Sequence, residues 1–516
     1  MTTGPGPGES DGAPGPGPSA PAREPSLLDA VVPLVTLAVL IGGSIALFGL
    51  DALDGPIQVA LVLCAMEAAL IAVKNGHSVD EVQHAAQGSV ASVTSAIFIL
   101  LAVGALIGVW NLSGTIPTLV YYGIQLLAPG WYYAAAALIC GVIALSIGSS
   151  WTTAGTIGVG LVGIATALDV SPEITAGAVV SGAYLGDKLS PLSETTVLAS
   201  QMVGVDTYEH IKRQVWTSVP AFVLAIIGFV VFGLVRGTDG NIVPEDVELT
   251  ALGDVYHITP LNLLPLALLA VLSIRKVPAA LALIAATLFA GLCAAVLQPD
   301  VVQAFAEDGG GVVVESIKAV WQAMATGFQM DSGVSEVDRL VSRGGMASML
   351  LTVWLIIGAV TFGALLEEFG MIARLVDPLI RAATSTGRLF ATVFACALGL
   401  NVVAGDQYIA LVLPTKVFRA EFARRDLAPT NLSRLAADSG TVTSPLVPWN
   451  SCGAFMGAVL GVSALQYLPY ALFNLFSPAL SVLYGFTGFR VERLDPATPA
   501  TTDEPTTAPE HTQARE

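Results

Sequence analysis

Charged residues are scarce in this sequence. Of its 516 residues, 12% are charged and 54% are hydrophobic, whereas an ordinary soluble domain carries about 25% charged residues. No charged residue occurs from Val82 to Leu168 or from Ser439 to Phe489, and a membrane-spanning helix needs about 20 apolar residues. The composition therefore excludes an ordinary soluble globule and predicts a multi-pass membrane protein.

Several chemical signatures are also missing. The five cysteines stand singly, without a C-x-x-C pair, so neither a disulfide framework nor a metal knuckle is indicated. H-E-x-x-H and G-x-S-x-G do not occur, so we expect no enzyme and no cofactor. The formal net charge of −18 argues against a nucleic-acid partner. The same negative charge points to a halophilic prokaryote, because high salt screens the repulsion within an acidic surface.

The apolar runs define the expected architecture. Further uncharged runs lie at 30–50, 214–235, 277–299 and 344–366. Together with the two long stretches, they predict an all-α polytopic membrane protein with about 11–13 transmembrane segments, re-entrant pieces included. We expect disordered tails at 1–26 and 491–516, membrane repeats at 27–240 and 279–490, and an acidic linker with one extra span at 241–278.

A short motif occurs twice and indicates an internal repeat. Gly186, Ser190, Pro191 and Leu192 recur 254 residues later as Gly440, Ser444, Pro445 and Leu446. The basic loop 416–434 has no basic counterpart at 162–180, so the cytoplasmic side is exchanged between the halves, as inverted-topology repeats require. With an extra span between the repeats, this reasoning places the N-terminal tail outside and the C-terminal tail inside.

The first copy of the motif supplies a candidate ion site. Residues 181–196 carry Asp187, Lys188 and Glu194 in a stretch that is otherwise small and hydroxylic. Ionisable groups at membrane depth are costly and usually functional, and hard cations favour neutral and anionic oxygen ligands. These features predict a cation site on a broken helix. The alternative is a solvated loop between two spans.

Two further carboxylates belong to the second half. Asp438 is the single charge in the run 438–450, where Pro445 and Pro448 prevent regular helical hydrogen bonding. Asp406 follows 17 uncharged residues, 389–405. Either aspartate could instead be structural, Asp438 as a helix cap and Asp406 as a hydrogen-bond partner of Ser149 or Thr152. Glu67 is a further candidate.

These runs give the predicted site. The transport and ion-binding residues are Asp187, Asp406, Glu194, Asp438, Ser190, Ser193, Thr195, Thr196, Ser150, Thr152, Thr443, Ser444 and Asn450. We expect Asp187 and Asp406 to hold Na⁺. We expect Lys188 to be a structural counter-ion for Asp187 or a neighbouring carboxylate, because an unpaired buried charge is very costly.

The run GDKLSPLSETT at 186–196 resembles the NhaC family of sodium/proton antiporters, within the ion transporter superfamily. Support comes from 148–153, 405–408, 432–434 and 438–450, so the resemblance covers nearly everything between the tails. It implies cation/proton exchange by alternating access in the cell membrane. Two positions depart from the usual family pattern: Glu194 stands where Asp is usual, and Thr152 where Gly is usual.

The sequence therefore predicts a sodium/proton antiporter in which Na⁺ and H⁺ compete for membrane-embedded carboxylates. A sodium- or proton-coupled transporter of a small carboxylic acid is the nearest alternative, with Lys188 or half-helix ends receiving the carboxylate. It would need a cavity larger than a bare ion requires. A passive channel is a more distant alternative. The expected partners are the lipid bilayer, Na⁺ and H⁺, and a homo-oligomer is left open.

Overall fold

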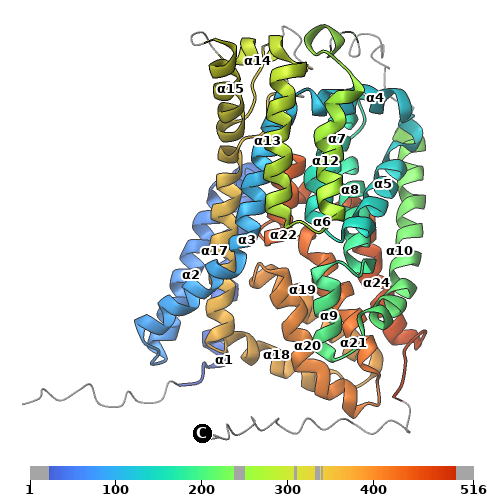
Figure 1. Ribbon diagram of the computed structural model, residues 1–516. Helices are drawn as coiled ribbons and strands as arrows, with labels where there is room; N and C mark the ends of the chain where they lie inside the picture. The colour runs from blue at the N-terminus through green and yellow to red at the C-terminus, as the bar shows by residue number, and fades with distance from the viewer. Residues whose placement is uncertain are drawn as a thin grey trace, which may run out of the picture.

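The computed structural model describes residues 23–236, 250, 252–306, 311–331, 337–338 and 341–494. Across these residues the secondary structure is helical, apart from an isolated β-bridge between Leu427 and Arg493. Eight of the described helices are long and apolar enough to cross a membrane, and a bent pair, Ser451–Leu460 with Ala464–Tyr470, makes up to nine. The prediction of an all-α, multi-pass membrane protein is confirmed. The other helices are shorter, and several end near mid-height in Figure 1.

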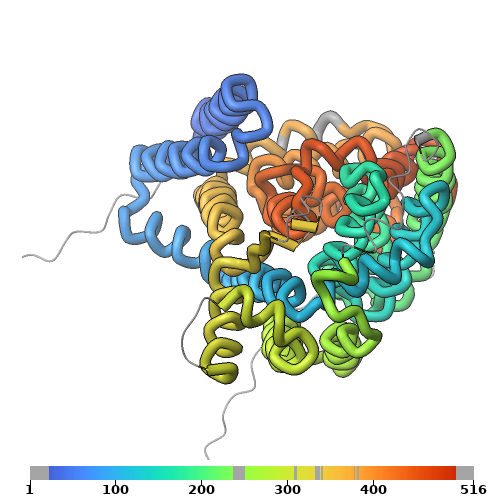
Figure 2. The backbone as a smooth tube through the Cα atoms, turned by 90° about the horizontal axis from the view of Figure 1, so that it is seen from above, coloured from blue at the N-terminus to red at the C-terminus, as the bar shows by residue number. Residues whose placement is uncertain are grey.

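The helices form two adjoining groups (Figures 1 and 2). The first group, here the wall bundle, contains α1 (Leu27–Phe48), α2 (Pro56–Lys74), α3 (Val79–Leu112), α12 (Leu264–Ile274), α13 (Ala279–Leu297), α15 (Val312–Thr326) and α17 (Leu350–Glu368). The second group, here the core bundle, contains α5 (Tyr132–Ile147), α6 (Ser150–Thr153), α7 (Val159–Ala167), α8 (Pro172–Leu189), α9 (Glu194–Val203), α10 (Thr207–Arg236), α19 (Thr386–Val403), α20 (Gln407–Arg424), α21 (Pro429–Ala436), α22 (Ser451–Leu460) and α24 (Leu472–Thr487).

Two short helices join the groups along the chain. Helix α4 (Thr115–Leu126) follows α3 at the upper end of the molecule in Figure 1, and α18 (Met371–Ala382) follows α17 at the lower end. Both lie across the bundle axis rather than along it (Figure 1). Among the described residues, one crossing helix therefore leads from the wall to the core at each end.

Corresponding helices of the two halves run in opposite directions. Helix α5 descends from the upper end to mid-height, whereas α19 rises from the lower end (Figure 1). Helices α10 and α24 pack against each other. In the wall, α1 packs on α2 as α12 packs on α13, and α2 packs on α17 as α13 packs on α3. From this exchange of partners we infer that α12 is the first helix of the second repeat rather than an extra span.

The helices break where the repeated motifs lie. Helix α8 ends at Leu189, and α9 begins at Glu194 after a turn that contains Pro191. In the second half, a π-helical turn at Ala437–Thr441 and a 3-10 turn at Ser444–Leu446 separate α21 from α22. Proline has no amide hydrogen to continue a helix, and interrupted helices at membrane depth leave polar backbone groups for a site.

Close packing of α8 on α5 fixes the backbone beside the first motif. A Cβ atom at Gly182 would overlap the carbonyl oxygen of Ala137, and one at Gly186 would overlap Ala144. Small residues allow membrane helices to approach this closely, which favours dispersion contacts where no hydrophobic effect operates. Gly186 therefore holds the end of α8, and with it Asp187, at a fixed depth.

The described ends of the chain lie at the same end of the molecule. Pro25 lies beside Gly370, which follows the lower end of α17, and Arg493 forms its bridge with Leu427, in the basic loop (Figure 1). These described ends lie on one side, whereas the sequence interpretation placed the tails beyond them on opposite sides. We infer that the difference arises from the extra span that this interpretation placed between the repeats. If α12 belongs to the second repeat, each half crosses an odd number of times and the two ends meet on one side.

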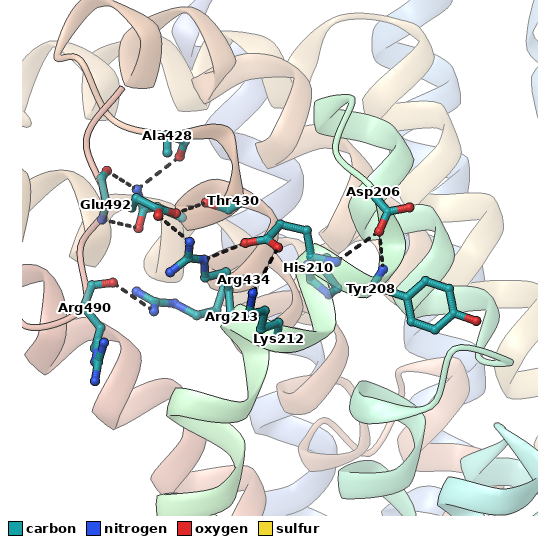
Figure 3. Close-up of polar contacts among 12 residues, drawn as sticks. Asp206, Tyr208, His210, Lys212, Arg213, Ala428, Thr430, Arg434, Arg490 and Glu492 are labelled. Atoms are coloured by element: carbon teal, nitrogen blue, oxygen red, sulfur yellow. Dashed lines mark hydrogen bonds and ion pairs between the residues drawn. The ribbon is translucent and has the colours of Figure 1, made fainter. Parts of the chain in front are cut away.

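The last described segment is bound to the core bundle. Glu492 pairs with Arg213 of α10 and accepts a hydrogen bond from Thr430 Oγ1 (3.1 Å) (Figure 3). Its backbone carbonyl accepts from the backbone amide of Ala428 (3.0 Å) and from Asn431 Nδ2 (2.6 Å), and its backbone amide donates to Asn431 Oδ1 (3.1 Å). The backbone carbonyl of Arg490 accepts a hydrogen bond from buried Arg434 (3.2 Å). Defined structure therefore continues to Leu494, beyond the expected tail boundary at 491; residues 1–22 and 495–516 lie outside the described residues.

Candidate functional site

A central cavity of about 910 Å³ lies between the wall and the core bundle. Its core side carries Ser150, Thr152, Asp187, Glu194, Thr195 and Asp406. Its wall side includes Ser89, Ser92, Val93, Ser95, Ala96 and Ile99 of α3, and Val360 and Ala364 of α17. Six predicted site residues, from both halves of the chain, therefore share one cavity. The carboxylates belong to the core, while α3 and α17 supply small and apolar side chains.

The cavity opens toward the lower end of the molecule in Figure 1. A second hollow of about 670 Å³ shares Ser89, Ser92, Ala364 and Ile409 with it. That hollow extends to His77, at the turn between α2 and α3, and to Glu367, at the lower end of α17. Because the basic loop 416–434 lies at this end, the positive-inside rule makes it the cytoplasmic side. We infer that the cavity in this structure is open to the cytoplasm.

Asp187 is surrounded by hydroxyl groups. Its side chain is buried and accepts hydrogen bonds from Ser193 Oγ (2.5 Å), Ser150 Oγ (2.8 Å) and Thr195 Oγ1 (3.4 Å). The hydroxyl of Thr196 donates to the backbone carbonyl of Asp187 (2.8 Å). Each hydroxyl can also offer its oxygen to a cation. A carboxylate with adjacent hydroxyl oxygens is the ligand set that a hard monovalent cation prefers.

Asp406 caps a helix and also lines the cavity. It is the N-cap of α20, and its Oδ1 atom accepts hydrogen bonds from the backbone amides of Tyr408 (2.7 Å) and Ile409 (3.1 Å). Gly405 precedes it with a φ of 63°, which turns the chain sharply into α20. The alternative role, a hydrogen bond to Ser149 or Thr152, is not what the structure shows, because Oδ1 bonds to these amides instead. The carboxylate still lines the cavity, together with Asp187.

Glu194 is bound to the other half of the chain at the cavity surface. Its Oε2 atom accepts a hydrogen bond from Tyr408 Oη (2.9 Å), and both side chains are exposed and line the cavity. Tyr408 stands two residues after Asp406, so this contact joins the starts of α9 and α20. Glu194 is the more solvated of the cavity carboxylates.

Asp438 and Lys188 form a separate, enclosed centre. Lys188 Nζ forms an ion pair with Asp438 Oδ1, and the two side chains are 1% and 0% exposed. Asp438 thus lies apart from the residues that line the cavity. Although Lys188 directly follows Asp187, its partner comes from the other half of the chain. An α-helix turns by about 100° per residue, so neighbouring side chains point in different directions.

The remaining predicted residues lie behind the cavity. Asn450 caps α22 and donates to Asn401 Oδ1 (3.0 Å), and Asn401 donates to Thr443 Oγ1 (2.9 Å). Ser444 lies 3.5 Å from Tyr184 Oη of the first half. Ser190 is the buried C-cap of α8. These residues support the broken helices. Cys452 lies beside Ser444, and Trp151 stacks on Phe455.

The sequence interpretation missed several polar residues. Gln214, Thr217 and Ser477 all bond to Asp438, and Tyr408 bonds to Glu194. The sequence contains a pattern from which Gln214, Thr217 and Ser477 could have been found. Gln214 and Thr217 begin an apolar run at a spacing of three, and Asn474, Ser477 and Ser481 form a polar stripe along one face of another apolar helix.

Comparison with known proteins assigns the chain to a family. The model of the Na⁺/H⁺ antiporter family matches residues 29–215 and 182–489. The chain belongs to this family. The Na⁺/H⁺ antiporter NhaC of Alkalihalophilus pseudofirmus is 38% identical over 397 residues, which cover 77% of this antiporter and 82% of that protein. The resemblance noted in the sequence is thereby confirmed, and the family is one of transporters.

Two other similar proteins carry different names. The arginine/ornithine antiporter ArcD of Halobacterium salinarum is 34% identical over 480 residues, 92% of this antiporter and 95% of that protein. The malate-2H⁺/Na⁺-lactate antiporter of Bacillus subtilis is 33% identical over 469 residues, 90% and 96% of the two chains. Similar proteins of this length therefore include exchangers of organic substrates as well as of Na⁺ and H⁺.

Proposed function

We propose that this protein is a sodium/proton antiporter of the cell membrane in which Asp187 and Asp406 form the exchange site. The observation that carries the proposal is that both buried carboxylates line one cavity and that Asp187 is bonded only through hydroxyl groups. A carboxylate at membrane depth must be neutralised by a partner. A proton or a sodium ion can serve, and the two cannot occupy the same oxygen together.

Competition of this kind is sufficient for exchange. A site that holds either ion, and reorients only when it is neutralised, couples one ion gradient to the other without a chemical step. For sodium, the ligands would be Asp187 with the hydroxyl oxygens of Ser150, Ser193 and Thr195. Neither a cofactor nor a resident metal is required, since Na⁺ is the cargo.

The arrangement of the bundles supports a route for the reorientation. All the carboxylates of the proposed site belong to the core, and the opposing surface of α3 and α17 offers small and apolar side chains. We propose that the core moves along this surface while α4 and α18 adjust at the two ends. The ion would then pass from cytoplasmic to extracellular access without leaving Asp187.

The test is counterflow in proteoliposomes. Purified protein is reconstituted, labelled sodium uptake is followed with and without an imposed pH gradient, and internal pH is recorded with a trapped dye. Outward sodium movement should drive protons inward, and an imposed pH gradient should drive sodium uptake. Sodium movement that is unaffected by either gradient would indicate a passive channel and contradict the proposal.

The cavity volume favours a second candidate, a sodium- or proton-coupled transporter of a small carboxylic acid. A cavity of about 910 Å³ is much larger than a bare cation requires, and organic-substrate sites commonly measure about 300–1,000 Å³. Lys188 cannot receive the acid in this structure, because it is enclosed with Asp438. Lys276, which lines the cavity, is the available cation. Stimulation of labelled sodium uptake by malate or lactate inside the vesicles would favour this candidate.

A further inference from the structure

The ammonium group of Lys188 is held as a bound cation would be held. Its partners are Asp438 Oδ1 and Ser477 Oγ (2.8 Å), and the ring of Phe473 lies 5.4 Å from Nζ. A carboxylate, a hydroxyl oxygen and an aromatic face are groups that bind monovalent cations. Lys188 is 1% exposed, so this ammonium has no contact with solvent.

Asp438 has the same kinds of neighbours as Asp187. Its Oδ1 atom accepts hydrogen bonds from Ser477 Oγ (2.8 Å), Gln214 Nε2 (2.8 Å) and Thr217 Oγ1 (3.3 Å). Asp187 bonds to three hydroxyl groups, where Asp438 bonds to two hydroxyl groups and one amide. The two aspartates differ in what neutralises them. Asp187 faces a cavity that ions can enter, whereas Asp438 is enclosed and already has a cation that is tethered to the chain.

Two oxygen atoms of the Asp438 centre are unused. Asp438 Oδ2 and Gln214 Oε1 are buried and have no hydrogen-bond partner among the residues that the structure describes. An ordinary ion pair inside a protein is stabilised by hydrogen bonds to its remaining lone pairs. Here, two oxygen acceptors beside the ion pair have no donor. A cation site provides such oxygen atoms as ligands.

We propose that Asp438, Ser477, Gln214 and Thr217 form a second monovalent-cation site that the Lys188 ammonium fills permanently. Asp438 then takes no part in ion exchange, and its charge is constant throughout the cycle. Lys188 is a positioning residue: its ammonium ties α8, which carries Asp187, to the π-helical turn of the other half. When that ammonium is removed, the vacated site accepts a free organic ammonium ion or Na⁺.

The experiment replaces the tethered cation with a free one. Lys188→Ala removes the equivalent of n-propylammonium while keeping Cβ, so n-propylammonium chloride is the matched probe and n-propanol its uncharged control. Thermal unfolding of the purified variant in detergent is measured with each, and with NaCl against choline chloride. Lys212→Ala is the control for loss of a lysine, because that side chain is 76% exposed and its distance to Glu209 is 3.9 Å.

The proposal expects the apparent Tm of Lys188→Ala to fall by several degrees and to rise again with n-propylammonium, and less so with Na⁺, but not with n-propanol. The double variant Lys188→Ala/Asp438→Asn should be more stable than Lys188→Ala, and its Tm should not respond to either cation. The Tm of Lys212→Ala should not respond to either cation. No response of Lys188→Ala to either cation would overturn the proposal, and so would an equal response of the double variant. A further outcome is that Lys188→Ala is obtainable only together with Asp438→Asn, even when n-propylammonium is present throughout purification. In that case the free amine does not replace the lysine, the pair is a simple ion pair, and the proposal fails.

This readout needs no transport, so it stands or falls separately from the proposed function. A second measurement rests on that function: in proteoliposomes, n-propylammonium should restore sodium/proton exchange to Lys188→Ala. A variant that is restabilised by the amine but remains inactive would contradict the positioning role while leaving the cation site in place.

Discussion

At the scale of single residues, the same side chain serves different purposes in different surroundings. Asp187, Asp406 and Asp438 are all buried aspartates. Asp187 is bonded by hydroxyl groups at a cavity, Asp406 by backbone amides at the start of a helix, and Asp438 by an ammonium group in an enclosed centre. In the proposed mechanism, their neutralising partners, rather than their identity, decide which of them can exchange ions.

Replacement of Asp187 with Asn tests the first of these environments. The amide keeps the shape. Its oxygen can still accept a hydrogen bond from one serine, and its NH2 group can donate to the hydroxyl oxygen of the other, so the protein should fold and insert. It cannot bind a proton or balance a sodium ion, so we expect sodium-driven proton movement to fall by roughly 100-fold or more, the loss expected for an interaction with a charged group. Exchange at the native rate, with an unchanged pH dependence, would show that Asp187 is not the coupling group.

Ser150→Ala should have a graded effect. It removes one of the hydrogen bonds to Asp187 and one potential sodium ligand but leaves the charge. We expect the sodium concentration for half-maximal exchange to rise about tenfold, while the maximal rate changes little, since one hydrogen bond to a charged group contributes about 1.5–3 kcal/mol. Tyr408→Phe is the matched control. Its hydroxyl bonds to solvated Glu194, so its loss should change the half-maximal concentration less than threefold.

At the scale of elements, α20 separates a structural role from a transport role. Asp406 caps this helix, and Asn and Ser are comparably good N-cap residues. If capping were its whole purpose, Asp406→Asn and Asp406→Ser would both be active. We expect both variants to keep the thermal stability of the native protein within about 1 kcal/mol and to lose exchange. Native exchange rates in either variant would reduce Asp406 to a helix cap.

Much of the element pattern could be predicted from the sequence. Proline and glycine marked the breaks at Pro191 and Pro445, and the absence of charge marked the long helices, because both effects are local. The partner of Lys188 could not be found in this way, since Asp438 is 250 residues distant and pairing depends on how α8 and the π-helical turn Ala437–Thr441 face each other. The start of the second repeat was hidden for a similar reason: residues 299–345 interrupt the constant spacing, so α12 has no match at the shift of 254.

At the scale of the whole molecule, the central cavity lies between two bundles and opens at the end that carries the basic loop. All five cysteines are buried, so the native protein should react little with a thiol reagent. Ser92 of α3 lines the cavity and is exposed. In oriented vesicles, Ser92→Cys should react with a membrane-impermeant thiol reagent from the side of the basic loop. Leu126→Cys, at the end of α4 and 80% exposed, should react from the opposite side. Equal reaction of both variants from one side would contradict this orientation.

The central claim is that sodium and protons compete for the same carboxylates. It is tested most directly by proton release when NaCl is added to purified protein in weakly buffered detergent solution, recorded with a pH-sensitive dye against choline chloride. Sodium should displace protons from the native protein, its affinity should weaken as the pH falls because more of the carboxylate is protonated, and Asp187→Asn should release none. Sodium binding whose affinity is independent of pH, or binding without proton release, would contradict the account.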